Sequence, residues 1–253
     1  SLINPVIYST LSIPIVFLFI SYTGYSSLAF AIMLTLLLSA LIGCLAAYLI
    51  KEPANALLLL TGITMVLLTL DVYTGARLML LSPLGSDAIA GGRFYGIGND
   101  YMGVLIASTI IFITLFLDRI PKKSVLKLLT ATIAMIIIAT AIGHPHFGAN
   151  VGGLITSIVA TGVLLMVLME KQLNLKLLVI IGLIAIAGVL IVARLDALFS
   201  TAPSHAGKTI NMLFSGGFPI FVSIIRTKLG ILVGTVYHSS WSLILLLSII
   251  ILV

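Results

Sequence analysis

Three short polar segments in an otherwise apolar chain carry the residue types that bind or transform a ligand. The first runs from Gly91 to Asp100 and contains four glycines, Arg93 and Asn99. A glycine-rich turn that leads into a helix leaves backbone N–H groups accessible and can receive an anion, and Arg93 adds a planar guanidinium suited to phosphate. We interpret Arg93 and Asn99 as substrate-binding. Asp100 is a catalytic candidate, because a carboxylate fits beside an anion only if it holds Arg93 or a metal. The alternative is a packed loop in which Asn99 or Asp100 caps the next helix.

The second segment runs from Gly143 to Gly153 and contains His144, His146 and Asn150. Two histidines around a proline could bind zinc with a third ligand, but their spacing differs from the i and i+4 pair of a zinc-binding helix. We therefore assign no metal and no cofactor, and interpret the segment either as a polar lining or as interfacial capping. Asn150, an amide between glycines at an expected helix start, is our second catalytic candidate.

The third segment combines Ser204, His205 and Lys208 with two cations further along, Arg226 and Lys228. Gly-Lys-Thr at 207–209 is similar to the end of a phosphate-binding P-loop, but Ala202 occupies the place of the first required glycine and no strand precedes it. His205 is a candidate acid or base near neutral pH. The other four are interpreted as substrate-binding.

A simpler interpretation of the third segment is also open. Residues 204–215 and 218–229 are expected to form two short helices lying in the membrane interface. In that case Ser204 caps the first helix, and Arg226 and Lys228 contact lipid phosphates.

The elements that position these segments must be membrane helices. Apolar residues make up 61% of the 253 positions and only 8% are charged, whereas soluble domains have about 25% charged residues. The mean hydropathy is +1.32. Although the net charge is +6, the cations are spread over several loops without interleaved aromatics, which argues against nucleic-acid binding.

Apolar runs between charged or glycine- and proline-rich breaks predict an all-α, polytopic transmembrane bundle of about eight spans. The chain begins without Met and ends inside an apolar run, so we expect one transmembrane domain, 1–253, from a longer protein. The expected spans are 6–22, 27–50, 54–71, 101–118, 125–142, 152–169, 177–193 and 237–253.

The short connections after the second, fourth and sixth spans carry Lys51, then Arg119 to Lys127, then Lys171 and Lys176. Basic short loops face the cytoplasm. The sequence therefore predicts a multi-pass cell-membrane protein whose three polar segments are extracytoplasmic, where cations outnumber carboxylates and form an electropositive cavity.

At these segments the chain resembles a family of uncharacterised bacterial polytopic membrane proteins. The similarity lies in Gly92 to Asn99, Gly148 to Gly153, and Ser204 to Gly207. Members of that family often carry an extracytoplasmic domain similar to alkaline phosphatases and sulfatases. The sequence departs from the family pattern at Asp100, where Glu is expected, and at Lys208, where Arg is expected. The resemblance implies fold and compartment and supplies no activity.

Three functional hypotheses follow. The first is a cavity for an anionic or phosphorylated, small or lipid-linked, cell-envelope substrate, with membrane lipids as the other partner and an enzymatic role left open. The second is a secondary transporter or lipid flippase, in which the glycine-rich breaks are half-helix ends that face a substrate. The third is a passive membrane anchor for a further domain. Oligomeric state is not predicted.

Overall fold

The computed structural model describes residues 3–24, 27–85, 96–120, 125–172, 174–199 and 205–252. Within these ranges the chain is helical and contains no strand. The longer helices are α1 (Ile3–Ile20), α2 (Leu28–Leu49), α3 (Pro53–Tyr73), α6 (Asn99–Leu117), α7 (Val125–Gly143), α8 (Val151–Leu168), α9 (Leu175–Phe199), α10 (His205–His238) and α11 (Ser240–Leu252). Short helices are η1 (Ser21–Thr23), α4 (Arg77–Leu81) and η2 (Pro83–Gly85). The all-α prediction is confirmed.

The helices begin where local sequence supplies a start signal. The Ser27 hydroxyl accepts a hydrogen bond from the backbone N–H of Phe30 and caps α2. Pro53 opens α3, where its missing N–H costs nothing. The Asn174 side chain accepts from the N–H of Leu177 at the start of α9. The long apolar runs are therefore divided into helices by caps and prolines.

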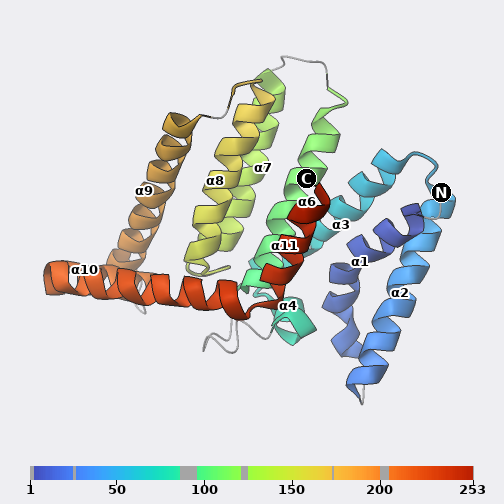
Figure 1. Cartoon of the computed structure of the whole chain (residues 1–253), viewed down its shortest axis with the longest axis horizontal. Coiled ribbons are helices and arrows are strands. Elements are labelled where there is room, and N and C mark those ends of the chain that lie inside the picture. The colour runs from blue at the N-terminus through green and yellow to red at the C-terminus, as the bar shows by residue number, and fades with distance from the viewer. Residues whose placement is uncertain are drawn as a thin grey trace. The chain divides into compact units, whose positions relative to one another are not determined.

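Seven helices, α1, α2, α3, α6, α7, α8 and α9, are long and apolar enough to cross a membrane (Figure 1). The first seven spans expected from the sequence match them within a few residues. In the described part of the chain an eighth span exists only as a bent pair, 225–238 with 242–250, whose two halves meet at 63°. The protein is therefore a multi-pass membrane protein with seven or eight spans.

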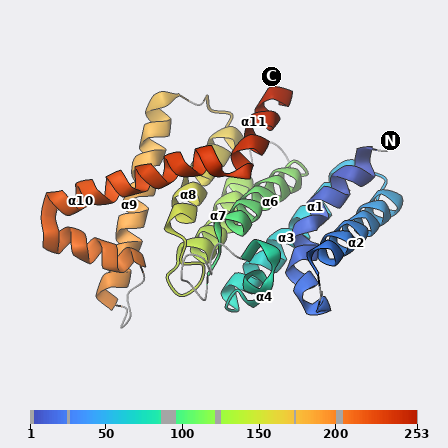
Figure 2. The ribbon, with the colours of Figure 1, turned by 60° about the horizontal axis from the view of Figure 1, so that its bottom comes forward.

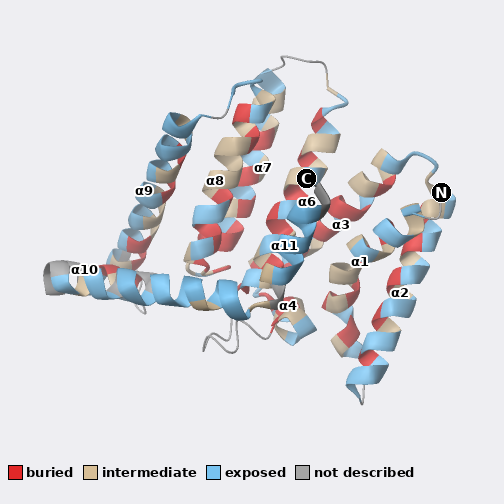
Figure 3. Ribbon diagram, viewed as in Figure 1, coloured by how far each residue is buried: buried red, intermediate tan, exposed pale blue. Residues whose placement is uncertain are grey.

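The chain divides into two compact units, 1–192 and 193–253. In the first unit α1 packs against α2, α3 against α6, and α7 against α8. Buried residues lie on the sides of these helices that face a neighbour (Figure 3). The largest core cluster contains Val72 at the end of α3, Tyr101 at the start of α6 and Ile142 at the end of α7. These three places therefore lie together at one end of the first unit.

The second unit differs from the sequence-based expectation of two short interfacial helices, 204–215 and 218–229. A single helix, α10, covers both, with Pro219 inside it. Proline removes one backbone hydrogen bond and bends a helix without necessarily ending it, and Figure 2 shows α10 as two arms that meet at a bend. The Gly-Gly-Phe-Pro run at 216–219 therefore lies inside one helix, where the sequence suggested a break.

Candidate functional site

Asn150 connects two segments that are far apart in the sequence. Its side-chain oxygen accepts from the N–H of Gly153, 2.8 Å away, which caps α8. Its Nδ2 group donates to the carbonyl of Ile97 at 3.1 Å and to Oδ1 of Asn99 at 3.2 Å. With only 5% of its surface exposed, Asn150 uses both ends of its amide to hold the start of α8 against the start of α6.

Two glycines bring the same segments into backbone contact. The N–H of Ile97 donates to the carbonyl of Gly148 at 2.9 Å. A Cβ atom on Gly96 would lie 2.4 Å from that carbonyl oxygen, and Gly96 has a φ of +92° that other residues rarely adopt. A Cβ on Gly148 would lie 2.3 Å from the carbonyl oxygen of Ile142. Close backbone approach, rather than loop flexibility, is therefore the role of Gly96 and Gly148.

The two helix starts differ in how their first-turn N–H groups are satisfied. Asn150 caps α8, whereas Gly98 occupies the cap position of α6 and no side-chain cap bond is present there in the described structure. A helix N-terminus carries partial positive charge on its unbonded N–H groups. Asn99 is exposed and Asp100 half-buried in the first turn of α6. The first polar segment therefore ends at a helix start whose partial positive charge lies beside the Asp100 carboxylate.

Tyr101 is a residue of this region that the sequence analysis missed. Its side chain is fully buried, and its hydroxyl has no hydrogen-bond partner within the described ranges. The hydroxyl lies beside the Ser82 side chain and within electrostatic reach of Asp71 and Asp100. The only signal in the sequence was the position of Tyr101 directly after Asn99 and Asp100. An ordinary aromatic residue of an apolar span could occupy the same position.

Asp71, near the end of α3, has a structural role. Its two carboxylate oxygens accept from the N–H groups of Leu78 and Met79, at 3.0 and 2.9 Å. Both donors belong to the first turn of α4, where a negative charge is favourable. Asp71 therefore fixes α4 against the end of α3.

The two histidines of the second segment contact each other. Nδ1 of His144 accepts from the backbone N–H of His146 at 3.2 Å, and the ring centroids are 5.6 Å apart. Phe147 packs edge-on against Tyr73, whose hydroxyl donates to the carbonyl of Ile137. No group of three His, Cys, Asp or Glu side chains suited to a metal ion occurs in the part of the chain that the structure describes.

The remaining candidates fall into two groups. Arg93 and Ser204 lie outside the described residues, as do the side chains of His205 and Lys228. Lys208 and Arg226 are exposed and lie on α10, on either side of Pro219. The structure thus brings together Asn99, Asp100 and Asn150 in the first unit, and the roles assigned to the other candidates stay predictions.

Comparison of the chain with protein-family models, with curated proteins and with solved structures finds no match.

Proposed function

We propose that the end of the first unit where α6 and α8 begin binds an anionic, phosphate-bearing substrate such as a lipid-linked cell-envelope intermediate. The observation that supports this most directly is the Asn150 side chain, which holds the start of α6 beside the start of α8. Two adjacent helix N-termini combine their partial positive charges. An anion that reaches this place meets the N-terminal turn of α6, where the cap position is Gly98 and has no side chain.

Arg93 completes the proposed anion site from the glycine-rich segment, six positions before Asn99. A guanidinium can hold a phosphate through two parallel hydrogen bonds, which an isolated helix terminus cannot do. Asn99, exposed in the first turn of α6, supplies a neutral polar contact. In this proposal Asp100 orients Arg93 and thereby avoids facing the anion alone.

We further propose that the polar segments lie on the extracytoplasmic side and that the residues of the third segment have the roles predicted from the sequence. The site opens to the extracytoplasmic side, and the chain is a member of the bacterial family that its motifs resemble. In the second unit, Ser204, Lys208, Arg226 and Lys228 are proposed to supply polar groups and cations for an anionic substrate, and His205 is proposed to exchange a proton if the substrate reacts.

No specific observation favours the transporter alternative. The hydroxyls of Thr61, Thr64, Thr109 and Ser157, which lie inside the spans, each donate to a carbonyl four residues earlier in their own helix. Such hydroxyls are satisfied locally and leave little polar surface for a path through the bilayer. The anchor alternative predicts that changes at Arg93 and Asn99 have no effect on ligand binding.

The test is binding of dodecyl phosphate, a single-chain phosphate monoester, to the purified chain in a non-ionic detergent, followed as a rise in the thermal unfolding midpoint. Arg119, an exposed cation just after the end of α6, is first changed to Gln in every sample, so that it cannot hold the phosphate. Dodecanol, which has the chain without the phosphate, is the reference ligand. We expect a concentration-dependent rise with dodecyl phosphate only. Arg93→Gln should remove most of it, whereas Lys171→Gln, which removes an exposed cation after α8, should leave it intact. Equal responses to the two ligands, or a full response in Arg93→Gln, would refute the proposal.

A further inference from the structure

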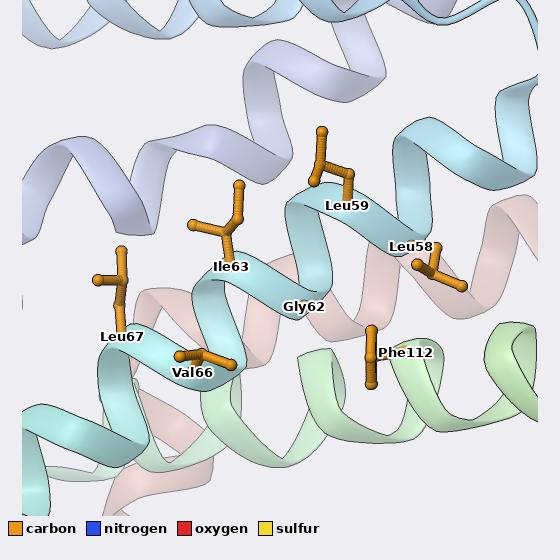
Figure 4. A pocket seen from close by; sticks show the side chains of 7 residues that line it. All are labelled: Leu58, Leu59, Gly62, Ile63, Val66, Leu67 and Phe112. Atoms are coloured by element: carbon orange, nitrogen blue, oxygen red, sulfur yellow. The ribbon is translucent and has the colours of Figure 1, made fainter.

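A groove of about 410 Å³ runs along α3 in the first unit. Six residues of α3 between Leu58 and Leu67 line it, together with Phe112 of α6, and all of them are apolar (Figure 4). Figure 4 shows Leu59, Ile63 and Leu67 along one edge and Phe112 facing Gly62 on the other. The groove lies on two membrane spans, so the medium that fills it is hydrocarbon.

Gly62 makes the groove hollow. Because Gly62 has no side chain, the Phe112 ring approaches the α3 backbone, and a Cβ at this position would lie 2.8 Å from a ring carbon. On the outer rim Leu59 and Val66 are each 47% exposed. The groove therefore has one flat aromatic wall, whereas the surface of an ordinary lipid-facing helix is covered by protruding side chains.

One end of the groove is cationic. Phe112 and Phe116 follow one another at i and i+4, which places them along one face of α6. The two rings stack with centroids 6.0 Å apart. Arg119 comes just after the end of α6 and donates from Nη2 to Oδ1 of Asn55 in the first turn of α3. An apolar wall thus leads directly to a guanidinium.

Arg119 has capacity for a further partner. Arg119 is exposed. It makes no ion pair with another described residue. The Asn55 amide that it contacts also donates to the Glu52 carboxylate at 2.8 Å. Lys51, just before α3, and Asp118, just before Arg119, are also charged, and both are exposed. A guanidinium held by a neutral amide keeps N–H donors for an external anion.

The dimensions suit one lipid chain. The stretch of α3 from Leu58 to Leu67 rises about 14 Å, and half of a hydrocarbon core is about 15 Å thick. The short-loop charges assign this end to the cytoplasmic leaflet, where anionic lipids are enriched.

We propose that this groove binds one acyl chain of an anionic glycerophospholipid whose phosphate is held by Arg119. The site lies at the opposite ends of α3 and α6 from Asn99 and Asn150, so it is independent of the substrate site proposed above. Its ligand is a resident lipid that fills the space between α3 and α6 and bridges their ends. Such a lipid stabilises the α3 and α6 pair without adding a protein contact.

The test uses the full chain in nanodiscs of phosphatidylcholine that contain a small fraction of phosphatidylglycerol with a diazirine midway along one acyl chain. After photolysis, peptide mass spectrometry maps the labelled residues. We expect labelling along 58–67 and at Phe112 well above that of lipid-facing α7 positions such as Ile133. Val66→Phe, which fills the groove, should reduce it about tenfold, the effect of losing roughly 1.4 kcal/mol. Ile133→Phe is the matched control and should leave groove labelling unchanged.

The head-group part is tested separately with Arg119→Gln and Arg119→Lys. We expect Gln to lower groove labelling about tenfold and Lys to restore much of it, because Lys keeps the charge and loses the planar fork. Four results would overturn the proposal: groove labelling no higher than at Ile133, labelling unaffected by Val66→Phe, labelling unaffected by Arg119→Gln, or equal labelling by a zwitterionic phosphatidylcholine probe. Crosslinks between copies of the chain at the groove would assign it to self-association instead.

Discussion

Asn150 donates a hydrogen bond from its side-chain amide to the side-chain oxygen of Asn99, 3.2 Å away and 51 positions earlier in the chain. The two residues belong to different polar segments and to different helices. Through this bond and the cap on Gly153, the start of α6 is fixed to the start of α8. These two hydrogen bonds therefore join the first and second polar segments, and substitutions that remove them should lower the stability of the protein.

Asn150→Ala should destabilise the protein more than the loss of an ordinary helix cap. Asn174, whose side chain caps α9 and is exposed, is the matched control, and Asn174→Ala should cost about 1 kcal/mol. Asn150→Ala also leaves the buried Ile97 carbonyl without its side-chain donor, which raises the expected loss to about 2–4 kcal/mol. The measurement is the thermal unfolding midpoint in detergent. Equal losses for the two variants would mean that the bridge to α6 contributes nothing.

Asn150→Asp separates the two roles of the amide. Aspartate caps a helix about as well as asparagine, but a carboxylate cannot donate to the Ile97 carbonyl. We expect an unfolding midpoint well below that of the wild type, because the new carboxylate oxygen faces two acceptor oxygens, those of Ile97 and Asn99. A midpoint as high as that of the wild type would assign the whole effect to the cap.

Gly96→Ala should disturb the contact between the two segments directly, and Gly148→Ala should disturb it by displacing Gly148 from the end of α7. A new Cβ would lie 2.4 Å from the Gly148 oxygen or 2.3 Å from the Ile142 oxygen, both backbone atoms, and overpacking costs about 1–3 kcal/mol. Gly152→Ala is the control, because its Cβ would have only Asn150 Oδ1 nearby, at 3.6 Å, and alanine favours the helix. The thermal midpoint should fall for the first two and stay or rise for the third. A loss at Gly152 equal to that at Gly148 would contradict this account.

Asp71→Ala should release α4 from the end of α3. Each hydrogen bond to a charged group contributes about 1.5–3 kcal/mol, and Asp71 accepts two. Asp71→Asn, which keeps one acceptor oxygen, should lose less. Trypsin cleavage after Arg77, an exposed residue at the start of α4, reports the release directly. Asp118→Asn, at an exposed position after α6, is the control and should not change cleavage at Arg77. Unchanged cleavage in Asp71→Ala would show that α4 is held by packing alone.

The spans were predictable because apolar run length decides them. A stretch of about 20 apolar residues becomes a membrane helix whatever its neighbours are, and the breaks at Pro53 and near Asn150 mark where helices start. The α10 bend was harder, since Gly216-Gly217 and Pro219 favour a break locally. A proline inside a helix can also bend it, and local sequence does not decide between these outcomes.

The site was only partly predictable. Asn99 and Asn150 were recognised separately as polar residues at helix starts, but their contact depends on how α6 and α8 pack. The spans are apolar on all faces, so no amphipathic pattern indicates which side of α6 faces α8. Tyr101 was missed for the same reason, since a buried hydroxyl cannot be identified until its neighbours are known.

The sidedness of the bundle can be tested with single cysteines, because the one natural cysteine, Cys44, can be replaced by Cys44→Ser. His146, before α8, and Lys171, after it, are both exposed and lie at opposite ends of that helix. The basic short loops predict that His146→Cys faces outward and Lys171→Cys faces the cytoplasm. A membrane-impermeant maleimide should therefore label His146→Cys in intact cells and Lys171→Cys only after permeabilisation. The reverse pattern would place the α6 and α8 starts in the cytoplasm, and with them the proposed phosphate site.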